Sequence, residues 1–243
     1  MNNLDNVRRF VDTFPLSITD DAEFESKHKR DKNGQFAKTA ESGGNNSESE
    51  DKNDQHSFDE LTNRVKIGEK VLDALPDITD KATIDAINVY TQDTTENAPF
   101  KKINRSLRKT GEFPEEFKKE CLAIEKAFET SKTSEPIFLA RGTTVGYVES
   151  WIKDSIYSEP NFLSTSITLN SPFSFAFNSA EKYKDKPAIV YLFVPSGAKA
   201  LKIDKLGANP KEREILLPRN TKCVLRDKIE DNGVVYYHVE VTK

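Results

Sequence analysis

Three short groups of residues carry the chemistry that this sequence offers, and each stands at the end or the start of an apolar run. Arg141 ends the run IFLAR, residues 164–166 (STS) end NFLSTS, and residues 212–214 (ERE) open EREILLP. A guanidinium suits bidentate contact with phosphate, and a hydroxyl can orient a carboxylate. On a strand, positions i and i+2 face the same side, so Glu212 and Glu214 are predicted to reach one site. There, one carboxylate can stabilise positive charge while the other positions or deprotonates a nucleophile.

Other common catalytic arrangements are absent from the sequence. The histidines are His28, His56 and His238, and the two cysteines, Cys121 and Cys223, lie far apart. Their spacing fits no zinc site, CxxC redox motif or disulfide framework, so no metal is expected. The glycine patterns of Rossmann folds, P-loops and nucleophile elbows are missing as well.

The charge balance narrows the classes of partner. The chain has 36 basic and 40 acidic residues, which gives a formal net charge of -4. An acidic chain without a basic helix face is not expected to bind nucleic acid stably, although residues 27–38 contain a local basic patch. There is no apolar run long enough to span a membrane and no signal-peptide pattern, so neither a membrane span nor a leader is expected.

Composition divides the chain near Ser57. Between Asp21 and Ser57 apolar residues are sparse, and the tract ESGGNNSESEDKNDQHS consists mainly of small polar and acidic residues. Such a stretch cannot bury enough apolar surface to offset the entropy of ordering it, so residues 1–56 are predicted to form a largely disordered tail and linker. A capping box, with Ser57 as N-cap and Glu60 three residues later, predicts that the folded part begins there.

Helix signals precede strand signals along the folded part. Apolar residues at helical spacing predict helices at 57–75, at about 81–90, from Pro99, and at about 114–129. After Glu135, short apolar runs such as PAIVYLFV and GVVYYHVEV predict strands, interrupted by short helices. This order predicts an α+β fold, with a helical lobe over residues 57–134 and a β core over residues 135–243.

Together, the three groups resemble the signature of the arginine–serine–glutamate class of mono-ADP-ribosyltransferases. That class has an arginine on one strand, Ser-Thr-Ser on another, and Glu-x-Glu or Gln-x-Glu opening a third. The segment AINVYTQDTTENAPFKKINRSLRK is similar to the helical lobe of the enzymatic components of clostridial binary toxins. The resemblance covers residues 82–243. It implies an ADP-ribosyltransferase domain over residues 57–243, with a β core of two mostly antiparallel sheets.

The resemblance also implies that NAD is the substrate, and it assigns roles to particular residues. Glu214 would stabilise an oxocarbenium-like transition state, Ser164 would orient its carboxylate, and Arg141 would contact the NAD phosphates. The implied NAD-binding residues are Arg141, Gly142, Tyr90, Phe100, Asn104, Arg108, Ser164, Thr165, Ser166 and Phe177. Phe175 is an alternative to Phe177 beside the nicotinamide, and core packing is the other interpretation of either ring.

The residues just before Glu214 are implied to select the acceptor. In the family, Glu-x-Glu goes with arginine acceptors, so Glu212 implies transfer to an exposed arginine of a target protein. Leu206 and Asn209, in the turn DKLGANPK, would take part in recognising that protein. This turn lacks the aromatic residue that many relatives carry, so the identity of the target stays open.

Departures from the family pattern concern NAD binding. Gly142 stands where several relatives have a second arginine, and Phe100 stands where relatives have a second tyrosine over NAD. The phosphate-contacting arginine that relatives carry downstream of Ser-Thr-Ser is missing from SPFSFAFNSAEK. Phe100 can still stack on a flat ring, but it lacks the tyrosine hydroxyl.

Two other functions stay open beside the transferase. One is an NAD glycohydrolase, in which water replaces the protein acceptor. The other is a catalytically idle structural or binding module of a phage, but the intact Arg141, Ser164, Glu212 and Glu214 favour an enzyme. The stretch HKRDKNGQFAK is similar to tails of phage structural proteins. Delivery into the cytoplasm of a target cell, from a phage virion or as a toxin or effector, is therefore expected.

The composition boundary predicts the outcome of limited proteolysis. Protease should remove the first 56 residues or so and leave a stable fragment that begins near Ser57, because the tail has too few apolar residues to build a core. Mass spectrometry of the digestion products would locate the cut. A resistant fragment beginning well before Asp21 would contradict the predicted boundary.

Overall fold

The computed structural model describes residues 66–92, 98–207 and 210–242. The predicted tail over residues 1–56 and the predicted cap at Ser57 and Glu60 lie outside the described residues.

The end of the first predicted helix, before Pro76, differs from the expectation. Lys66 forms an isolated parallel β-bridge with Ile137, and η1 (Gly68–Ala74) is a 3-10 helix. The backbone N–H of Lys66 donates to the carbonyl of Pro136 at 3.0 Å, and its carbonyl accepts from Phe138 at 3.2 Å. These contacts hold Lys66 beside the first strand, so tertiary pairing overrides the helical spacing of the sequence.

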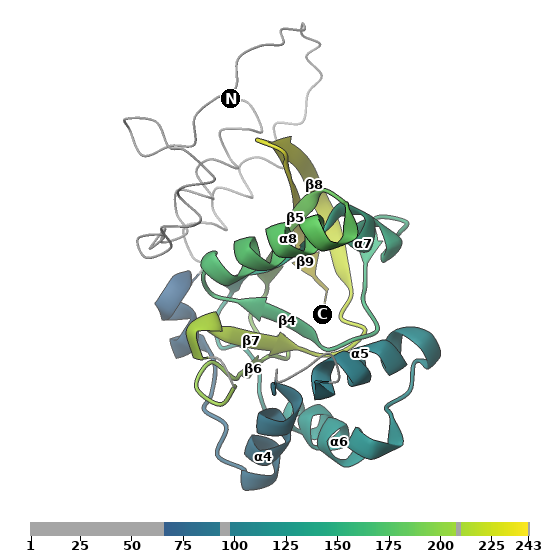
Figure 1. The fold of residues 1–243 in the computed structure, drawn as a ribbon. Coiled ribbons are helices and arrows are strands. Elements are labelled where there is room, and N and C mark those ends of the chain that lie inside the picture. Colours follow the sequence, from purple (N-terminus) through teal and green to yellow (C-terminus); the bar gives the residue numbers. More distant parts are fainter. Residues whose placement is uncertain (1–65, 93–97, 208–209, 243) are drawn as a thin grey trace, which may run out of the picture.

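The helices that follow form a lobe at one end of the sheet (Figure 1). They are α4 (Lys81–Tyr90), α5 (Pro99–Thr110) and α6 (Lys118–Ala127), the last preceded by the 3-10 turn η2 (Glu115–Phe117). Asp80 caps α4 by accepting a hydrogen bond from the Thr83 N–H at 2.9 Å. Pro99 opens α5, and Gly111, whose φ is 74°, ends it. The helices predicted at 81–90 and from Pro99 are thereby confirmed.

Within the described residues, nine strands form one mixed sheet in the order β2-β3-β8-β9-β5-β1-β4-β7-β6. In chain order the strands are β1 (Ile137–Thr144), β2 (Ile152–Lys153), β3 (Ile156–Tyr157), β4 (Leu163–Ser166), β5 (Pro187–Val194), β6 (Leu201–Lys202), β7 (Glu214–Leu217), β8 (Cys223–Asp231) and β9 (Val234–Val241). All neighbours are antiparallel except β5 and β9, which are parallel. The fold is α+β, and the strands come after the helical lobe as the sequence predicts.

The sequence analysis expected two sheets, but the structure joins these strands in one. A single residue pair, Ala140 with Ser166, joins β1 to β4, whereas β1 pairs with β5 from Ile137 to Thr144. Two well-paired groups of strands therefore meet at one point and count as one sheet. The residues of the catalytic signature lie at this junction, on β1, β4 and β7 and in the turn before β7.

Two helices cover the sheet beside this junction: α7 (Val145–Ser150) and α8 (Asn170–Tyr183). Phe173 and Ala176 of α8 share a buried cluster with Phe138 and Ala140 of β1. The opposite face of β1 carries Ile137 and Leu139, which belong to a separate cluster together with the buried side of η1. The central strand β5 is buried on both faces, so its sequence is an almost continuous apolar run.

Close contact between α8 and β1 explains the glycine that follows Arg141. A Cβ atom added at Gly142 would lie 1.6 Å from the backbone oxygen of Pro172, in the first turn of α8. No side chain fits there without moving the helix. The second arginine of several relatives is therefore excluded at this position by the packing of α8.

This contact predicts that Gly142→Ala destabilises the fold. The expected loss is about 1–3 kcal/mol or more, as for other overpacked sites, because the clash is with backbone. Urea denaturation would measure it. Gly207→Ala is a matched control, since its Cβ would meet its nearest neighbours, the Ile203 carbonyl oxygen and the Thr91 side chain, at 3.5 Å or more. Equal stability of Gly142→Ala and the wild type would contradict the close packing.

Candidate active site

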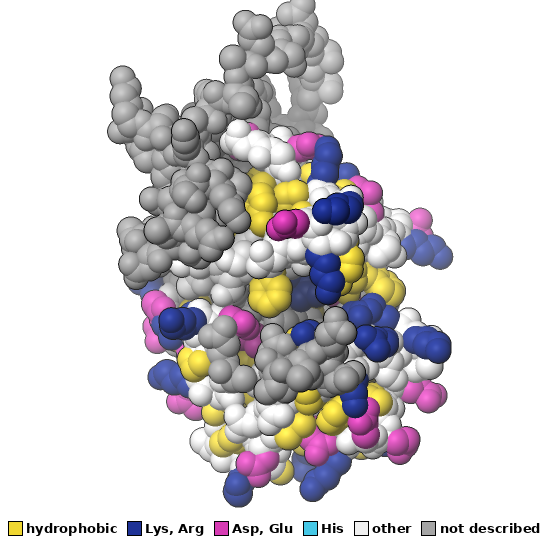
Figure 2. Space-filling view, viewed as in Figure 1, with side chains coloured by type: hydrophobic (Ala, Val, Ile, Leu, Met, Phe, Trp, Pro, Cys, Tyr) yellow, Lys and Arg dark blue, Asp and Glu magenta, His cyan; other side chains and the backbone are white. Residues whose placement is uncertain are grey.

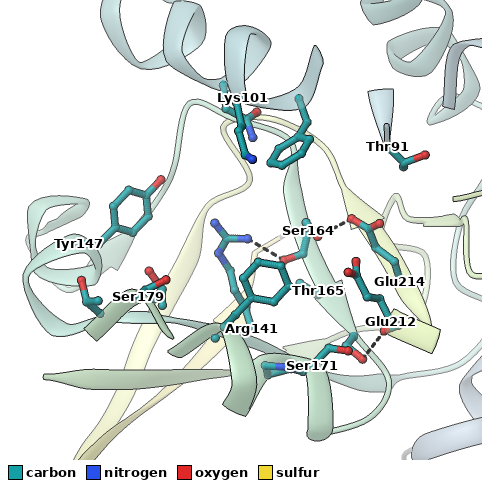
Figure 3. Close-up of a pocket in the computed structure, with 18 of the residues that line it drawn as sticks. Thr91, Lys101, Arg141, Tyr147, Ser164, Thr165, Ser171, Ser179, Glu212 and Glu214 are labelled. Carbon is teal, nitrogen blue, oxygen red and sulfur yellow. Dashed lines mark hydrogen bonds between the residues drawn. The ribbon is translucent and has the colours of Figure 1, made fainter. Parts of the chain in front are cut away.

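A cavity of about 1070 Å³ lies where β1, β4 and β7 meet, between the helical lobe and α8 (Figure 3). Its wall combines residues from the three groups singled out in the sequence with side chains of α5 and α8. The lining residues are Tyr90, Thr91, Gln92, Phe100, Lys101, Asn104, Arg105, Arg108, Ala140, Arg141, Gly142, Thr143, Thr144, Tyr147, Ser164, Thr165, Ser166, Ser171, Pro172, Phe175, Ser179, Lys182, Tyr183, Glu212 and Glu214.

The three hydroxyls of residues 164–166 hold the segment that carries the two glutamates. The Ser164 hydroxyl donates to the Glu214 carboxylate (Figure 3). The Thr165 hydroxyl donates to the Ile215 carbonyl at 2.6 Å. The Ser166 hydroxyl donates to the carbonyl of Glu212 at 2.7 Å. β4 thus holds the side chain of Glu214 and the backbone of Ile215 and Glu212. Of the two glutamate side chains, these bonds fix only that of Glu214.

This setting shifts the pKa of the Glu214 carboxyl group upward. Burial raises its pKa to about 7, the nearby Glu212 carboxylate adds to the rise, and Ser164 and Arg141 act in the opposite direction. A carboxyl group with a pKa near neutrality is typical of a functional site. At pH 8 it is mostly a buried anion, which is the form that attracts a developing positive charge.

Glu212 is held differently from the prediction that both glutamates share a strand. It ends the 3-10 turn η3 (Pro210–Glu212), and β7 begins only at Glu214. Arg213, between them, has a φ of 49°, in the left-handed region that side chains other than glycine seldom adopt. Alternation along a strand therefore does not explain why both carboxylates line the cavity. The turn at Arg213 brings them together instead (Figure 3).

Arg141 lies against a buried carboxylate that the sequence analysis missed. Its Nη1 donates to the Ser164 carbonyl at 2.8 Å and its Nη2 donates to Glu159 Oε2 at 3.3 Å, while its Nε lies 3.2 Å from Glu159 Oε1. The side chain of Glu159 is fully buried. Burial is the largest single influence on the pKa of Arg141 and would lower it, but Glu159 and the nearby tyrosine hydroxyls together outweigh burial, and the net shift is upward. Part of the guanidinium's donor capacity is therefore used inside the protein.

Three polar side chains complete the surroundings of Glu159. The hydroxyls of Tyr147 (2.9 Å) and Tyr157 and the amide of Asn161 (3.0 Å) donate to its carboxylate. A buried carboxylate is tolerated only with such compensation. No motif in the sequence points to Glu159, because Arg141 and Tyr147, which compensate its charge together with the local Tyr157 and Asn161, come from other elements. Its role is visible only in the folded chain, where the buried carboxylate lies against the Arg141 guanidinium.

Positive charge lines the cavity on the side of α5. Lys101, Arg105 and Arg108 all contribute to the wall, and Lys182 faces them from α8. Figure 2 shows Lys and Arg side chains gathered over α5 on this face of the molecule. These side chains could bind the phosphates of an anionic ligand, in place of the second strand arginine that Gly142 excludes.

The structure brings together most of the residues predicted to bind NAD, but not Phe177. Tyr90, Phe100, Asn104 and Arg108 line the cavity, as do residues 141–142 and 164–166. Phe177 instead packs beside Phe173 against the cluster under α8. Phe175, two positions before Phe177, points to nearly the opposite side of the helix and lines the cavity.

The cavity-facing side of α8 carries a different aromatic residue. Ser171, Phe175 and Ser179, spaced four residues apart, all line the cavity, and Phe175 is 53% exposed. Of the two phenylalanines that the sequence analysis considered, Phe175 therefore lines the cavity and Phe177 does not.

The residues predicted to recognise the acceptor are placed only in part. Glu212 lines the cavity, whereas Leu206 packs against the apolar cluster of the helical lobe and is not a lining residue. The role of Leu206 in recognising the acceptor stays a prediction. Asn209 lies outside the described residues.

Two kinds of feature are missing from the described part of the chain. Over residues 66–92, 98–207 and 210–242, no group of three His, Cys, Asp or Glu side chains could hold a metal ion. Among the same residues, no helix is both long and apolar enough to span a membrane.

Several solved structures share this fold. An ADP-ribosyltransferase from Clostridium botulinum is 20% identical with a TM-score of 0.52, and the match covers 82% of this chain and 100% of that one. A protein from S. aureus, solved with NAD, is 21% identical with a TM-score of 0.55, covering 76% and 95%. Exoenzyme S from Pseudomonas aeruginosa, in complex with human 14-3-3 protein beta and bound to carba-NAD, is 20% identical with a TM-score of 0.54, covering 66% and 74%.

Sequence comparison adds what these low identities cannot show. Among curated proteins, none matches the chain significantly. The profile of the family described as ADP-ribosyltransferase exoenzyme, however, matches residues 65–242. This match spans most of the sequence and includes every element around the cavity, so the chain belongs to the ADP-ribosyltransferase exoenzyme family.

Proposed function

We propose that the protein is an NAD-dependent mono-ADP-ribosyltransferase that modifies arginine side chains of a target protein. The reaction breaks the bond between ribose C1′ and the nicotinamide nitrogen. It forms a bond between that carbon and a guanidinium nitrogen, and nicotinamide and one proton are released. The observation that carries the proposal is the Glu214 carboxylate, held by Ser164 and flanked by Glu212 in a cavity with a cationic wall.

The cavity has groups suited to each part of NAD. Arg105, Arg108 and Lys182 supply cations for the diphosphate, in addition to the N–H groups of Arg141 that remain available. Phe100 and Phe175 offer aromatic faces on which flat rings can stack. A volume of about 1070 Å³ is at the upper end of the usual range for ligand pockets, as a dinucleotide requires.

Glu214 is assigned to the ribose. As nicotinamide leaves, positive charge develops on the sugar, and a preorganised anion stabilises that charge more in the transition state than in the ground state. The hydrogen bond from Ser164 fixes the orientation of the carboxylate. Because the carboxylate is oriented before the substrate binds, no free energy is needed to reorient it during the reaction.

Glu212 is assigned to the acceptor. A carboxylate beside the reacting carbon can bind an incoming guanidinium by charge-assisted hydrogen bonds and take up the proton that it loses. The Glu212 carboxylate lies close enough to Glu214 to raise the pKa of Glu214, which supports the assignment of both groups to one reaction centre. The choice of arginine as acceptor rests on this carboxylate and on the family pattern of Glu-x-Glu.

Substituting the two glutamates separately tests this division of roles. Glu214→Gln should abolish both transfer to protein and NAD hydrolysis, because an amide cannot stabilise the oxocarbenium charge. Glu212→Gln should abolish transfer but leave residual hydrolysis, since water needs less help than a guanidinium. Each loss is expected to be about 10²–10³-fold, roughly 2.7–4 kcal/mol.

Nicotinamide release, measured with and without the arginine analogue agmatine, separates the outcomes. Parallel loss of both activities in the two variants would refute the division of roles. Full nicotinamide release by Glu214→Gln would refute the transferase. Wild-type protein that hydrolyses NAD but modifies neither agmatine nor any protein in a lysate would favour the glycohydrolase.

The pKa of Glu214 predicts a pH dependence. Since the carboxylate is the active form, kcat/KM for nicotinamide release should fall on the acid side of an apparent pKa near the value of about 7. Glu212→Gln removes a neighbouring negative charge, which lowers the pKa of Glu214, so this limb should move to lower pH. The acceptor-free assay reports it. An acid limb that stays in place or moves upward would contradict the coupling.

A further inference from the structure

We propose that Arg213, between the two glutamates, is a positioning residue that keeps Glu212 where it can act on the acceptor guanidinium. The inference rests on the proposed function, because that function assigns Glu212 to the acceptor and Glu214 to the ribose. Arg213 is not one of the residues that line the cavity. Its influence on the reaction is therefore exerted through the backbone of its neighbour and not by contact with substrate.

The Arg213 side chain is bound by two carboxylates, Glu69 from a distant part of the chain and Asp204 from the start of the preceding segment. Its Nε donates to Glu69 Oε1 at 3.1 Å, and its Nη2 pairs with Glu69 Oε2, so the two groups meet as a bidentate fork. Its Nη1 lies 3.5 Å from Oδ2 of Asp204. Asp204 is buried, with 4% of its surface exposed, so it depends on a cation nearby.

The two carboxylates are themselves fixed by the fold. Glu69 belongs to η1, whose Val71 and Ala74 are buried in the core beneath the sheet. Asp204 stands at the start of the segment that leads to Glu212, in a turn closed by hydrogen bonds from the N–H groups of Leu206 and Gly207 to the carbonyl of Ile203. Arg213 thus connects both ends of the segment 204–213 to each other and to η1.

Glu212 needs this connection more than Glu214 does. Glu214 is paired with Ser166 in the sheet, and its carboxylate accepts from Ser164. Glu212 lies outside the sheet, in η3, where its carbonyl accepts from Ser166. The direction of its side chain follows from the turn at Arg213, whose φ of 49° reverses the chain between the two glutamates. The ion pairs of Arg213 hold that turn.

Substitution of Arg213 should therefore change the partition between acceptor and water. Arg213→Lys keeps the charge but loses the fork, and Arg213→Gly removes the side chain while accepting the positive φ. In both, transfer to agmatine should fall about tenfold or more, while acceptor-free nicotinamide release stays within about twofold of the wild type. Glu69→Gln should shift the partition in the same direction, because it removes the negative charge and one of the two oxygens that the Arg213 guanidinium binds.

A second arginine–glutamate pair provides the matched control. Arg226 donates to Oε2 of Glu240 through Nε at 2.8 Å and Nη2 at 2.6 Å, on strands that do not line the cavity. Arg226→Lys should leave both activities unchanged. Circular dichroism and thermal melting establish which variants are folded, and if Arg213→Gly is not, Arg213→Lys and Glu69→Gln decide the question.

The ratio of agmatine transfer to acceptor-free hydrolysis is the deciding measurement. A lowered ratio in folded Arg213→Lys and Glu69→Gln, with Arg226→Lys unchanged, supports the positioning role. An unchanged ratio, including a parallel fall of both activities, overturns it. Glu212→Gln, assayed alongside, separates the two hypotheses. If it lowers the ratio and the Arg213 variants do not, only the positioning role fails. If it leaves the ratio unchanged, the assignment of Glu212 to the acceptor fails, and the positioning role fails with it.

Discussion

The hydrogen bond from Ser164 to the Glu214 carboxylate depends on strand register, and the rest of the site depends on that bond. β4 and β7 pair so that Ser164 lies opposite Leu216 and Ser166 opposite Glu214. Ser164 and Glu214 are therefore diagonal neighbours on one face of the sheet. A shift of the register by one residue would turn one of them to the other face. The hydroxyls of Thr165 and Ser166 bind backbone carbonyls of the same segment, which opposes such a shift.

Arg141 secures the site from the other side of the sheet junction. Because β1 and β4 share only one residue pair, backbone hydrogen bonds do little to fix their separation at the cavity. The Arg141 guanidinium bridges this gap by donating to the Ser164 carbonyl, and the buried Glu159 compensates its charge. The positive charge of Arg141 also lowers the pKa of Glu214 and so partly offsets the rise that burial causes. One cation thus contributes to both the geometry and the electrostatics of the candidate active site.

The packing of α8 against β1 determines which positions beside the cavity can carry a cation. The backbone of α8 lies so close to β1 that only glycine fits at position 142. Cations facing the cavity come instead from α5 and from Lys182 of α8, on elements that reach the cavity from outside the sheet. The same approach of α8 presents Phe175 to the cavity and keeps Phe177 in the core. Packing of one helix therefore decides which charges and which aromatic rings are available to a ligand.

The sequence by itself determined the α+β class, the helix at 81–90 and the start of α5 at Pro99, because local spacing encodes them. Its motifs and the resemblance that they carry identified 11 of the 25 residues that line the cavity. Tertiary structure alone decided three other features. Lys66 joins β1 instead of a helix, because its backbone bonds to a distant strand. The left-handed turn at Arg213, whose side chain pairs with the distant Glu69 and with Asp204, replaces the strand alternation predicted for Glu212. The buried Glu159 belongs to no motif, since Arg141 and Tyr147 become its neighbours only when β1 and α7 pack against it.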